Sequence, residues 1–196
     1  NKIADLCSEN KIKCFRGSLD DVLDRYYQAA KKYSADAVLR ITGDCPAIDP
    51  EIVDKIISEY ISGDYDCFGL GGKFPDGLDC TVYSFHALEK AWKEASLQSE
   101  REHVGPYIEQ NKKKFKNGSL ELFSESEEQR WTLDELEDYY LLSNVFEELY
   151  DPDTPFLAKD ILYFLDKNPN IKKINSKIKR NEGYLKSLTR EKHRHE

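Results

Sequence analysis

The chain is predicted to fold as an α/β protein, because short apolar segments alternate along it with amphipathic ones. The segment 37–41 is mostly apolar without clean alternation, which is typical of a strand covered on both faces. The segment 50–61 repeats apolar residues three and four positions apart, which predicts a helix with one buried stripe. A strand and a helix precede them at 12–15 and 20–33. This order favours parallel strands joined by right-handed crossovers.

The first residues have the pattern of a helix end, at 2–9, and lead into the predicted strand at 12–15. The loop Arg16-Gly17-Ser18 then connects that strand to the helix at 20–33. The chain starts at Asn1 and contains no methionine. We therefore expect the natural start of the protein to lie elsewhere.

The strand at 37–41 ends in the turn Gly43-Asp44-Cys45-Pro46. Asp44 is thus expected beyond the carboxyl end of a strand, at the edge where open α/β sheets bind ligands. Asp49 is placed to cap the next helix, with Pro50 at its first position, where a missing N–H costs nothing. Asp is also common in turns, so a purely structural role for Asp44 stays open at this point.

The segment after residue 64 has a different texture. Two strands are predicted at 65–70 and 78–84, and the stretch 69–77 holds four glycines and a proline. This pattern indicates an irregular loop or arm that projects over a site.

Helices follow at about 85–95 and from Ser99, where Ser99 and Glu102 have the spacing of a capping box. The lysines at 112–114 read as a solvated end, and 120–123 is a short strand candidate.

The last part is predicted to hold a strand at 130–134 that ends in a carboxylate, Asp134, followed by an amphipathic helix. A final helix is expected at 158–166, and the polar, basic end at 191–196 reads as a mobile tail. We expect residues 1–190 to form a single domain that is incomplete at its N-terminus.

Composition limits the function. A net charge of −8 and a pI near 5.2 argue against general binding to nucleic acid or to anionic membranes. No apolar run approaches the roughly 20 residues of a transmembrane helix, and no signal segment opens the chain. We therefore expect a cytoplasmic protein, which needs a local basic site or a metal ion to bind a phosphate-bearing substrate.

The cysteines suggest neither a zinc site nor a disulfide framework, because their number is odd and no C-x-x-C occurs. We expect them to be reduced and partly buried. Cys45, beside Asp44, is not favoured as a nucleophile because no histidine is near it in sequence. The five are Cys7, Cys14, Cys45, Cys67 and Cys80.

Several short motifs, read together in order, resemble one family. They are Arg16-Gly17-Ser18, Asp20-Asp21-Val22-Leu23-Asp24-Arg25, the run from Arg40 to Pro50, Asp76-Gly77-Leu78-Asp79, Ser99-Glu100-Arg101-Glu102-His103, Arg130-Trp131-Thr132-Leu133-Asp134 and Asn181-Glu182-Gly183-Tyr184-Leu185. The chain resembles the spore-coat polysaccharide biosynthesis cytidylyltransferases, which are similar to the acylneuraminate and ketodeoxyoctulosonate cytidylyltransferases. The resemblance implies a Rossmann-like nucleotide-sugar transferase fold with three α/β/α layers. It also implies transfer of CMP from CTP to a sugar acid for surface polysaccharides, with release of pyrophosphate.

The same resemblance implies that Asp44 and Asp134 hold Mg²⁺. This agrees with the preference of Mg²⁺ for one or two carboxylates together with phosphate oxygens. The ion would polarise the α-phosphate and orient the attacking sugar hydroxyl. The alternative for Asp134 is the N-cap of the following helix, where Asp is favoured.

Near the cytosine or ribose, the resemblance places Arg16, Gly17, Ser18 and Asp21, with Arg25 supporting their loop. The alternative is structural: Ser18 and Asp20 would cap a helix, and Arg25 would make a surface ion pair worth at most about 1 kcal/mol.

For the sugar, the resemblance implies five residues that can hydrogen-bond a polyhydroxylated acid, with an arginine fork for its carboxylate. His103 has the alternative of a satisfied structural histidine. The five are Asp79, Arg101, Glu102, His103 and Arg130.

The chain departs from the family at its start. The family opens with a strand and a glycine-containing basic loop that holds the triphosphate, and no such segment occurs here. The lysines at 112–114 lack the strand-loop-helix setting of a phosphate cradle. We therefore expect a fold that lacks its first strands and an enzyme of impaired activity.

Two other functions stay open at this point. A glycosyltransferase of the same fold usually shows Asp-x-Asp at the strand end, whereas this chain has Gly43-Asp44-Cys45-Pro46, which favours nucleotidyl transfer. An inactive binding or dimerisation remnant is the other, with 69–115 as an arm that forms a homodimer.

Overall fold

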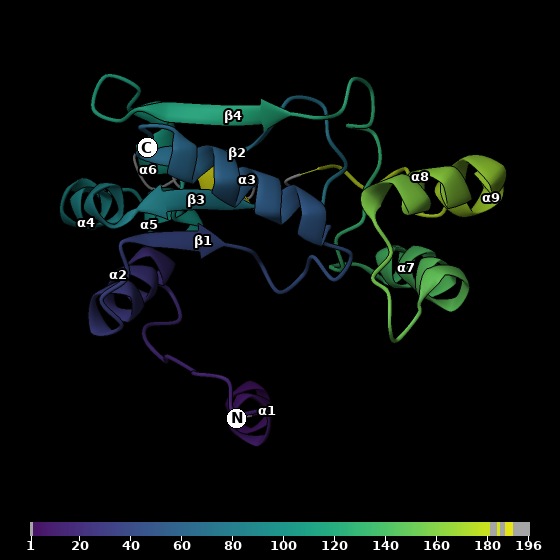
Figure 1. Cartoon of the computed structure of the whole chain (residues 1–196), viewed down its shortest axis with the longest axis horizontal. Helices are drawn as coiled ribbons and strands as arrows, with labels where there is room; N and C mark the ends of the chain where they lie inside the picture. The colour runs from purple at the N-terminus through teal and green to yellow at the C-terminus, as the bar shows by residue number, and fades with distance from the viewer. Residues whose placement is uncertain (1, 181–183, 185–186, 190–196) are drawn as a thin grey trace.

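The computed structural model describes residues 2–180, 184 and 187–189. Its centre is a four-stranded mixed sheet with the order β1-β3-β2-β4 (Figure 1). The sheet pairs β3 antiparallel with both β1 and β2, and β2 parallel with β4. The strands are β1 (Ala37–Arg40), β2 (Cys67–Gly71), β3 (Thr81–Ser84) and β4 (Asn117–Glu121). The prediction of parallel strands is thus right for β1, β2 and β4, which share one direction, and wrong for β3, which runs against them.

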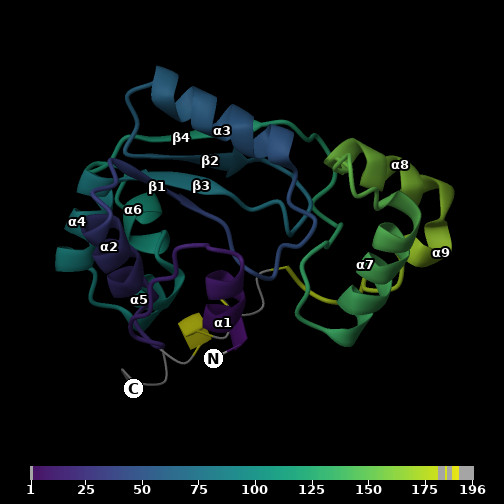
Figure 2. The ribbon, with the colours of Figure 1, turned by 60° about the horizontal axis from the view of Figure 1, so that its bottom comes forward.

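Helices cover both faces of the sheet, which gives the predicted three layers (Figure 2). Successive strand residues point to opposite faces. Phe68 and Val82 therefore pack with Ile52 and Ile56 of α3 (Pro50–Ser62) on one face. The next residues along the strands, such as Cys67 and Tyr83, join the core on the other face. That second face is covered by α2 (Val22–Lys32), α4 (Phe85–Glu94) and α6 (Pro106–Gln110).

A group of helices lies beyond one end of the sheet and shares the core of α3. Asp49 ties this group to the sheet: one of its carboxylate oxygens caps α3 through the backbone N–H groups of Glu51 and Ile52, and the other accepts from the N–H of Ala158 at 2.8 Å. The predicted cap by Asp49 is therefore confirmed and also spans two elements. These helices are α7 (Leu136–Leu149), α8 (Ala158–Lys167) and α9 (Pro169–Lys172).

Two predicted strands are wrong. Residues 12–15, which follow helix α1 (Lys2–Glu9), are irregular and largely exposed, because they pair with no strand of the described chain. Residues 130–134 contribute a single bridge, between Arg130 and Asp76, because Arg130 turns its side chain into a buried ionic network. The predicted carboxylate at the end of that segment is nevertheless kept in place by loop hydrogen bonds.

The capping box predicted at Ser99 and Glu102 is also wrong. The helix there, α5 (Gln98–His103), begins one residue earlier, and Glu100 accepts hydrogen bonds from the N–H groups of Ser96 and Leu97. The box therefore closes on Glu100, which leaves Glu102 pointing away from the helix start.

All five cysteines are free, as predicted, and three of them are buried. No helix among the described residues is long and apolar enough to cross a membrane. The predicted tail at 191–196 lies outside the described residues, and the single domain at 1–190 stays a prediction.

Candidate functional site

The turn after β1 is fastened to the segment that precedes α7. The backbone carbonyl of Asp44 accepts from the N–H of Leu133 at 2.8 Å and from the hydroxyl of Thr132 at 3.0 Å. Within the turn, the N–H of Cys45 donates to the carbonyl of Thr42. These contacts bring Asp44 and Asp134, far apart in sequence, to the same edge of the sheet.

Asp134 is oriented by two side chains and remains accessible. Its Oδ2 accepts from Arg130 Nη2 at 2.7 Å and lies 3.4 Å from the hydroxyl of Thr132. The side chain is 48% exposed. The N-cap residue of α7 is Glu135, and Asp138 receives the N–H groups at this helix start. The alternative role of Asp134 as a helix cap is therefore wrong.

The two carboxylates suit a magnesium ion. Among the described residues, the one hydrogen-bond contact of the Asp44 carboxylate is a long one, 3.8 Å from Cys45 Sγ, and Asp134 Oδ1 has no partner. In the same part of the chain, no three His, Cys, Asp or Glu side chains gather into a metal cage. Mg²⁺ usually binds through one or two carboxylates and completes its shell with water and substrate phosphates. The carboxylates of Asp44 and Asp134 are ligands of this kind.

Arg130 lies at the centre of a buried ionic network. Its Nε donates to both oxygens of Asp138 at 3.0 and 3.1 Å, Nη1 donates to Asp76 at 3.1 Å, and Nη2 donates to Asp134 and Asp138. Asn175 adds hydrogen bonds to Asp138 Oδ1 and to the carbonyl of Arg130, both at 2.8 Å. Each of the three guanidinium nitrogens thus donates to a carboxylate of the protein.

Charge pairing dominates in this network. Burial opposes ionisation of Asp138, yet the hydrogen bonds from Arg130 and Asn175 outweigh burial and hold the pKa of Asp138 below its usual value. Burial likewise opposes the charge of Arg130, and its carboxylate partners still raise the pKa of Arg130. The resemblance made Arg130 a candidate for binding a substrate carboxylate. In the structure, its guanidinium already binds three aspartates.

A second arginine borders the network. Arg180 donates to the carbonyl of Phe74, stacks 4.2 Å from the centre of that ring, and lies 3.6 Å from Asp79 and 3.9 Å from Asp76. Burial, and then the charge of Asp79, raise the pKa of Asp76. Burial also raises the pKa of Cys45 to about 12, which makes this thiol unsuited to nucleophilic catalysis.

The loop that carries Asp76 and Asp79 requires a glycine between them. Gly77 has φ of +104°, and a Cβ there would lie 2.6 Å from the carbonyl carbon of Trp131. The N–H of Gly77 donates to Asp79 Oδ2 at 3.2 Å, which orients a carboxylate that is 39% exposed. This close backbone approach explains how the predicted arm meets the 130–134 segment.

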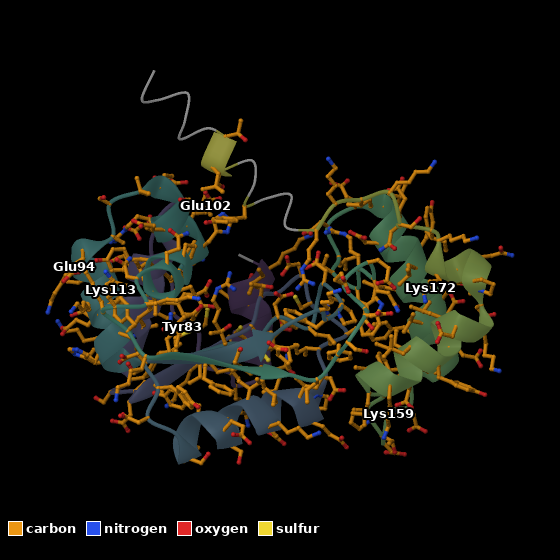
Figure 3. All side chains as sticks on the ribbon, turned by 90° about the horizontal axis from the view of Figure 1, so that it is seen from above. Tyr83, Glu94, Glu102, Lys113, Lys159 and Lys172 are labelled. Atoms are coloured by element: carbon orange, nitrogen blue, oxygen red, sulfur yellow. The ribbon has the colours of Figure 1, made fainter. Side chains whose placement is uncertain are left out.

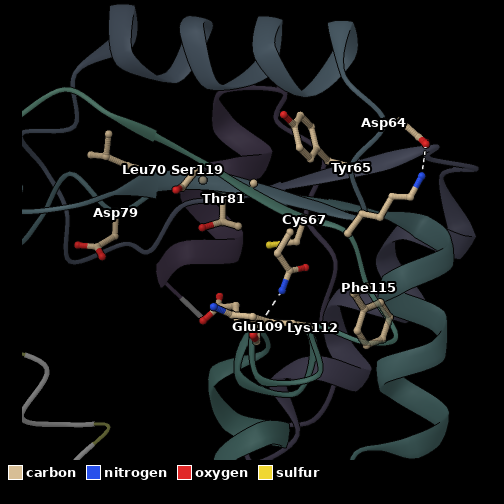
Figure 4. A pocket seen from close by; sticks show the side chains of 14 residues that line it. Asp64, Tyr65, Cys67, Leu70, Asp79, Thr81, Glu109, Lys112, Phe115 and Ser119 are labelled. Atoms are coloured by element: carbon tan, nitrogen blue, oxygen red, sulfur yellow. Dashed lines mark hydrogen bonds and ion pairs between the residues drawn. The ribbon is translucent and has the colours of Figure 1, made fainter.

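A groove of about 850 Å³ opens beside this loop, between the sheet and α6 (Figure 4). Asp79 lies at one end of it, and the contacts from Asp79 through Arg180, Asp76 and Arg130 reach Asp134. Asp64 and Lys116 form an ion pair at the other end. The lining residues are Asp64, Tyr65, Cys67, Gly69, Leu70, Asp79, Thr81, Glu109, Lys112, Phe115, Lys116, Asn117, Gly118 and Ser119.

The comparisons with known proteins identify the family of this fold. Residues 1–176 match the family described as "Cytidylyltransferase". This chain belongs to the cytidylyltransferase family. The resemblance found in the sequence is thereby confirmed, and nucleotidyl transfer from CTP is the activity that the family's name describes.

Three relatives place the chain more closely. It is 40% identical over 183 residues to the uncharacterized protein MJ1063 of Methanocaldococcus jannaschii, covering 91% of this chain and 73% of that protein. It is 26% identical over 168 residues to the spore coat polysaccharide biosynthesis protein SpsF of Bacillus subtilis, covering 84% and 69%. The structure of a cytidylyltransferase from Leptospira borgpetersenii superposes with a TM-score of 0.82 at 31% identity, covering 87% of this chain and 73% of that one.

In this cytidylyltransferase, two of the predicted substrate residues bind each other. Arg101 Nε donates to both oxygens of Asp21 at 3.1 and 3.0 Å, and Nη2 donates to Oδ2 at 2.5 Å. Arg101 Nη1 donates to the carbonyl of Trp92 at 2.7 Å, and Asp21 also caps α2 through the N–H of Asp24. Their pairing joins α2 to α5. The resemblance had assigned Asp21 to the nucleotide and Arg101 to the sugar.

The predicted nucleotide loop is a compact turn before α2. The hydroxyl of Ser18 accepts from the N–H of Asp21, and Arg25 donates to the carbonyl of Ser18, both at 3.1 Å. A Cβ on Gly17 would lie 3.3 Å from the side chain of Arg25, while Arg16 is exposed. Arg25 therefore supports this loop, as expected, in place of a surface ion pair.

Glu102 and His103 anchor the C-terminal part of the chain. Ser187 donates to Glu102 Oε2, and its hydroxyl lies 3.1 Å from His103 Nε2. The His103 ring packs edge-on against Tyr184. Figure 3 shows Glu102 beside this short helical segment. Of the predicted motif around Tyr184, the other residues lie outside the described chain.

A strained backbone follows His103. Val104 is buried with φ of 70° and ψ of −56°, and the N–H of Gly105 donates to the carbonyl of His103 at 2.8 Å. This is a γ-turn of the rare hand, and positive φ is unusual for a β-branched residue. Such strain is concentrated at ligand sites, so the turn supports a functional role for the end of α5.

Sequence reasoning missed several residues of this region. Asp138 and Asn175 complete the buried network, and Arg180 borders it. Asp138 gave a usable signal, because it is the third residue of α7, where an acidic side chain that caps the helix start is favoured. Asn175 and Arg180 follow only from the tertiary fold.

Proposed function

We propose that this protein transfers CMP from CTP to a sugar acid and releases pyrophosphate, in the synthesis of a surface polysaccharide. The observation that carries the proposal is that the turns of Asp44 and Asp134 are fastened to each other, and that the Arg130 network links Asp134 to Asp79 at one end of a polar groove. The similarity to a spore coat polysaccharide biosynthesis protein supports the polysaccharide role. A cytoplasmic location and a homodimer remain predictions.

The carboxylates serve the nucleotide end of the reaction. Asp44 and Asp134 would hold Mg²⁺, which when bound supplies Lewis-acid polarisation of the α-phosphate. Arg130 and Thr132 hold the Asp134 carboxylate in one orientation, and Leu133 fixes the Asp44 turn. Because positioning is a large part of phosphoryl-group catalysis, these supports act on rate.

The groove serves the acceptor. Its lining offers hydroxyl, amide and carboxylate groups that suit a polyhydroxylated ligand: Asp79, Thr81, Glu109, Asn117 and Ser119. Asn117 Oδ1 is buried without a hydrogen-bond partner among the described residues, so a sugar hydroxyl could satisfy it. Gly69 admits the Thr81 hydroxyl to this wall, because a Cβ there would lie 2.7 Å from Thr81 Oγ1.

The bond changes are those of a single displacement. The acceptor hydroxyl attacks the α-phosphorus of CTP, the bond from that phosphorus to the bridging oxygen breaks, and pyrophosphate leaves with the bonding electrons. The hydroxyl proton is lost to solvent or to a carboxylate near the groove end. Asp79 is oriented there by Gly77 and Arg180.

The test is pyrophosphate release from CTP and Mg²⁺ with a panel of sugar acids, neutral sugars and sugar phosphates. Asp44→Asn is expected to lower turnover by about 10²–10³-fold while the fold and melting temperature stay close to wild type. Full activity in Asp44→Asn would remove Asp44 from the metal site. The proposal would fail if none of these acceptors led to pyrophosphate release and no nucleotide gave a Mg²⁺-dependent thermal shift.

A matched comparison tests the prediction that an N-terminal phosphate loop strengthens CTP binding. A version extended by an N-terminal strand and a glycine-containing basic loop is assayed beside this chain. The prediction requires the extended version to bind CTP more tightly, and equal affinities would contradict it. For the Asp44→Asn assay, Asp54→Asn on the exposed side of α3 provides a control for the loss of one carboxylate elsewhere.

A further inference from the structure

Arg40 is the last residue of β1, four positions before Asp44. It shares a face of the sheet with Val38, because strand side chains alternate, and Val38 packs in the core under α2 and α4. Its cross-strand partner is Thr81, which lines the groove. Arg40 therefore lies on the groove side of the sheet, near the edge that carries the proposed metal site.

The guanidinium of Arg40 has no counter-ion in the part of the chain that the structure describes. Its Nε is buried without a hydrogen-bond partner, and within residues 2–180, 184 and 187–189 no carboxylate pairs with this side chain. The other buried side-chain atoms without partners, on Asn117, Gln129 and Trp131, are uncharged. Arg40 is thus the one charged residue among these four.

An unpaired, partly buried cation needs an explanation. Buried charges in folded proteins are paired or bind ions, because desolvating one without a partner is costly. The other arginines of the region obey this rule: Arg130 contacts three aspartates, Arg101 grips Asp21, and Arg180 borders Asp76 and Asp79. Arg40 departs from the rule and presents unused donors.

The surroundings of Arg40 extend into the groove. Tyr83, on the same face, donates its hydroxyl to Glu109 at 3.1 Å, and Glu109 lines the groove. Burial raises the pKa of Tyr83, the charge of Glu109 adds to this rise, and the charge of Arg40 opposes it. The charge of Arg40 therefore affects the pKa of Tyr83, which contacts the groove residue Glu109, although no ion pair joins Arg40 to Glu109.

We propose that Arg40 receives the carboxylate of the acceptor sugar acid. This inference rests on the proposed function and names the group that would select acids. In keto-deoxy sugar acids the carboxylate is attached to the carbon that bears the reacting hydroxyl. Its receptor must therefore lie at the metal end of the groove, whereas Lys116 pairs with Asp64 at the other end.

Arginine suits this role because its planar fork can donate two parallel hydrogen bonds to a carboxylate. A phosphate of CTP would present similar oxygens to Arg40. The carboxylate is favoured because the side chain shares its face with Thr81 and the groove. The two anions are separated by measuring sugar and nucleotide binding independently.

The test compares each acid with its own neutral ester. Dissociation constants for N-acetylneuraminate and ketodeoxyoctulosonate, as free acids and as methyl esters, are measured by ligand-observed NMR on wild type, Arg40→Gln and Arg40→Lys. Wild type is expected to bind at least one acid about tenfold more tightly than its ester, the effect of one charge-assisted pair. Arg40→Gln is expected to bring that ratio to about one, and Arg40→Lys to keep part of it.

Two controls make the outcome specific. Unchanged ester affinity in Arg40→Gln shows that the groove is intact. Lys159→Gln removes the same charge from α8, outside the groove lining, and should leave the acid-to-ester ratio as in wild type.

Three results would overturn the inference. In the first, wild type makes no distinction between acid and ester, or binds neither. In the second, Arg40→Gln keeps the wild-type ratio. In the third, Arg40→Gln loses affinity for CTP and keeps the sugar ratio, which would assign Arg40 to a phosphate. Pyrophosphate release with a neutral acceptor would leave nucleotidyl transfer in place and refute only the acid specificity.

Discussion

Arg130 and Arg40 lie near the same edge of the sheet, and their surroundings are opposite. Arg130 is 7% exposed and is enclosed by Asp76, Asp134 and Asp138. Arg40 is partly buried, and its Nε has no partner among the described residues. The first arrangement is that of a structural cation, and the second is that of a cation kept for a ligand. Arginine in a site motif is therefore a weak guide until its donors have been accounted for.

The largest expected effect comes from breaking the Arg130 network. Arg130→Gln leaves the fully buried Asp138 carboxylate and its neighbours without their cation. Removing one partner of a buried ion pair typically costs about 3–5 kcal/mol. We expect a loss of this size in the free energy of unfolding, measured by denaturant titration. Lys172→Gln, which loses an exposed pair with Asp166, should change little. A loss below about 1 kcal/mol for Arg130→Gln would contradict a structural role.

A smaller effect is expected from pH. The pKa of Asp138 is lowered in the folded protein from the ordinary value of 3.8. Its ionised form therefore stabilises the fold above that pH, and the contribution is lost as pH falls through the lowered pKa. Asp138→Asn should lower stability by about 1–3 kcal/mol at neutral pH and make unfolding less dependent on pH in the acid range.

Asp76 supplies the control of opposite sign. Its pKa is raised, mainly by burial, so its ionisation in the folded state costs stability as pH rises above 3.8. Asp76→Asn should therefore remove a contribution to the free energy of unfolding that decreases as pH rises. Identical pH profiles for the two variants would show that burial and pairing have been assigned to the wrong aspartates.

The smallest expected effect comes from Arg40. Arg40→Gln removes a charge that has no partner among the described residues, so the free energy of unfolding should change by less than about 0.5 kcal/mol or should rise. Thermal and urea unfolding without ligand measure this directly. A loss of more than about 1 kcal/mol would indicate a protein partner for Arg40 and would erase its contrast with Arg130.

The sequence predicted the parts of the fold that depend on local patterns. The stripe of α3, its cap by Asp49 and the strand that ends before Asp44 follow from residue spacing and capping preference. The strand at 12–15 failed because a strand needs a neighbour, and no local pattern shows whether one exists. The antiparallel β3 was missed for the same reason, since pairing partners are set by the tertiary fold.

The sequence predicted the residues of the candidate site better than the contacts between them. Asp44 and Asp134 were identified, and the structure brings their loops together. Arg101 and Asp21 were assigned to different substrates, yet they are 80 positions apart in sequence and bind each other. Arg40 was read as part of a strand, because a missing partner becomes visible only when all neighbours are placed.

The most direct test of the account follows the phosphorus atoms. CTP and Mg²⁺ are incubated with the protein and with each acceptor, and ³¹P NMR follows the α-phosphate. The account predicts a new sugar–CMP phosphodiester signal and pyrophosphate in equal amounts, with a sugar acid and with wild-type Asp44. Loss of only the γ-phosphate, or a phosphodiester formed equally well by Asp44→Asn, would contradict it.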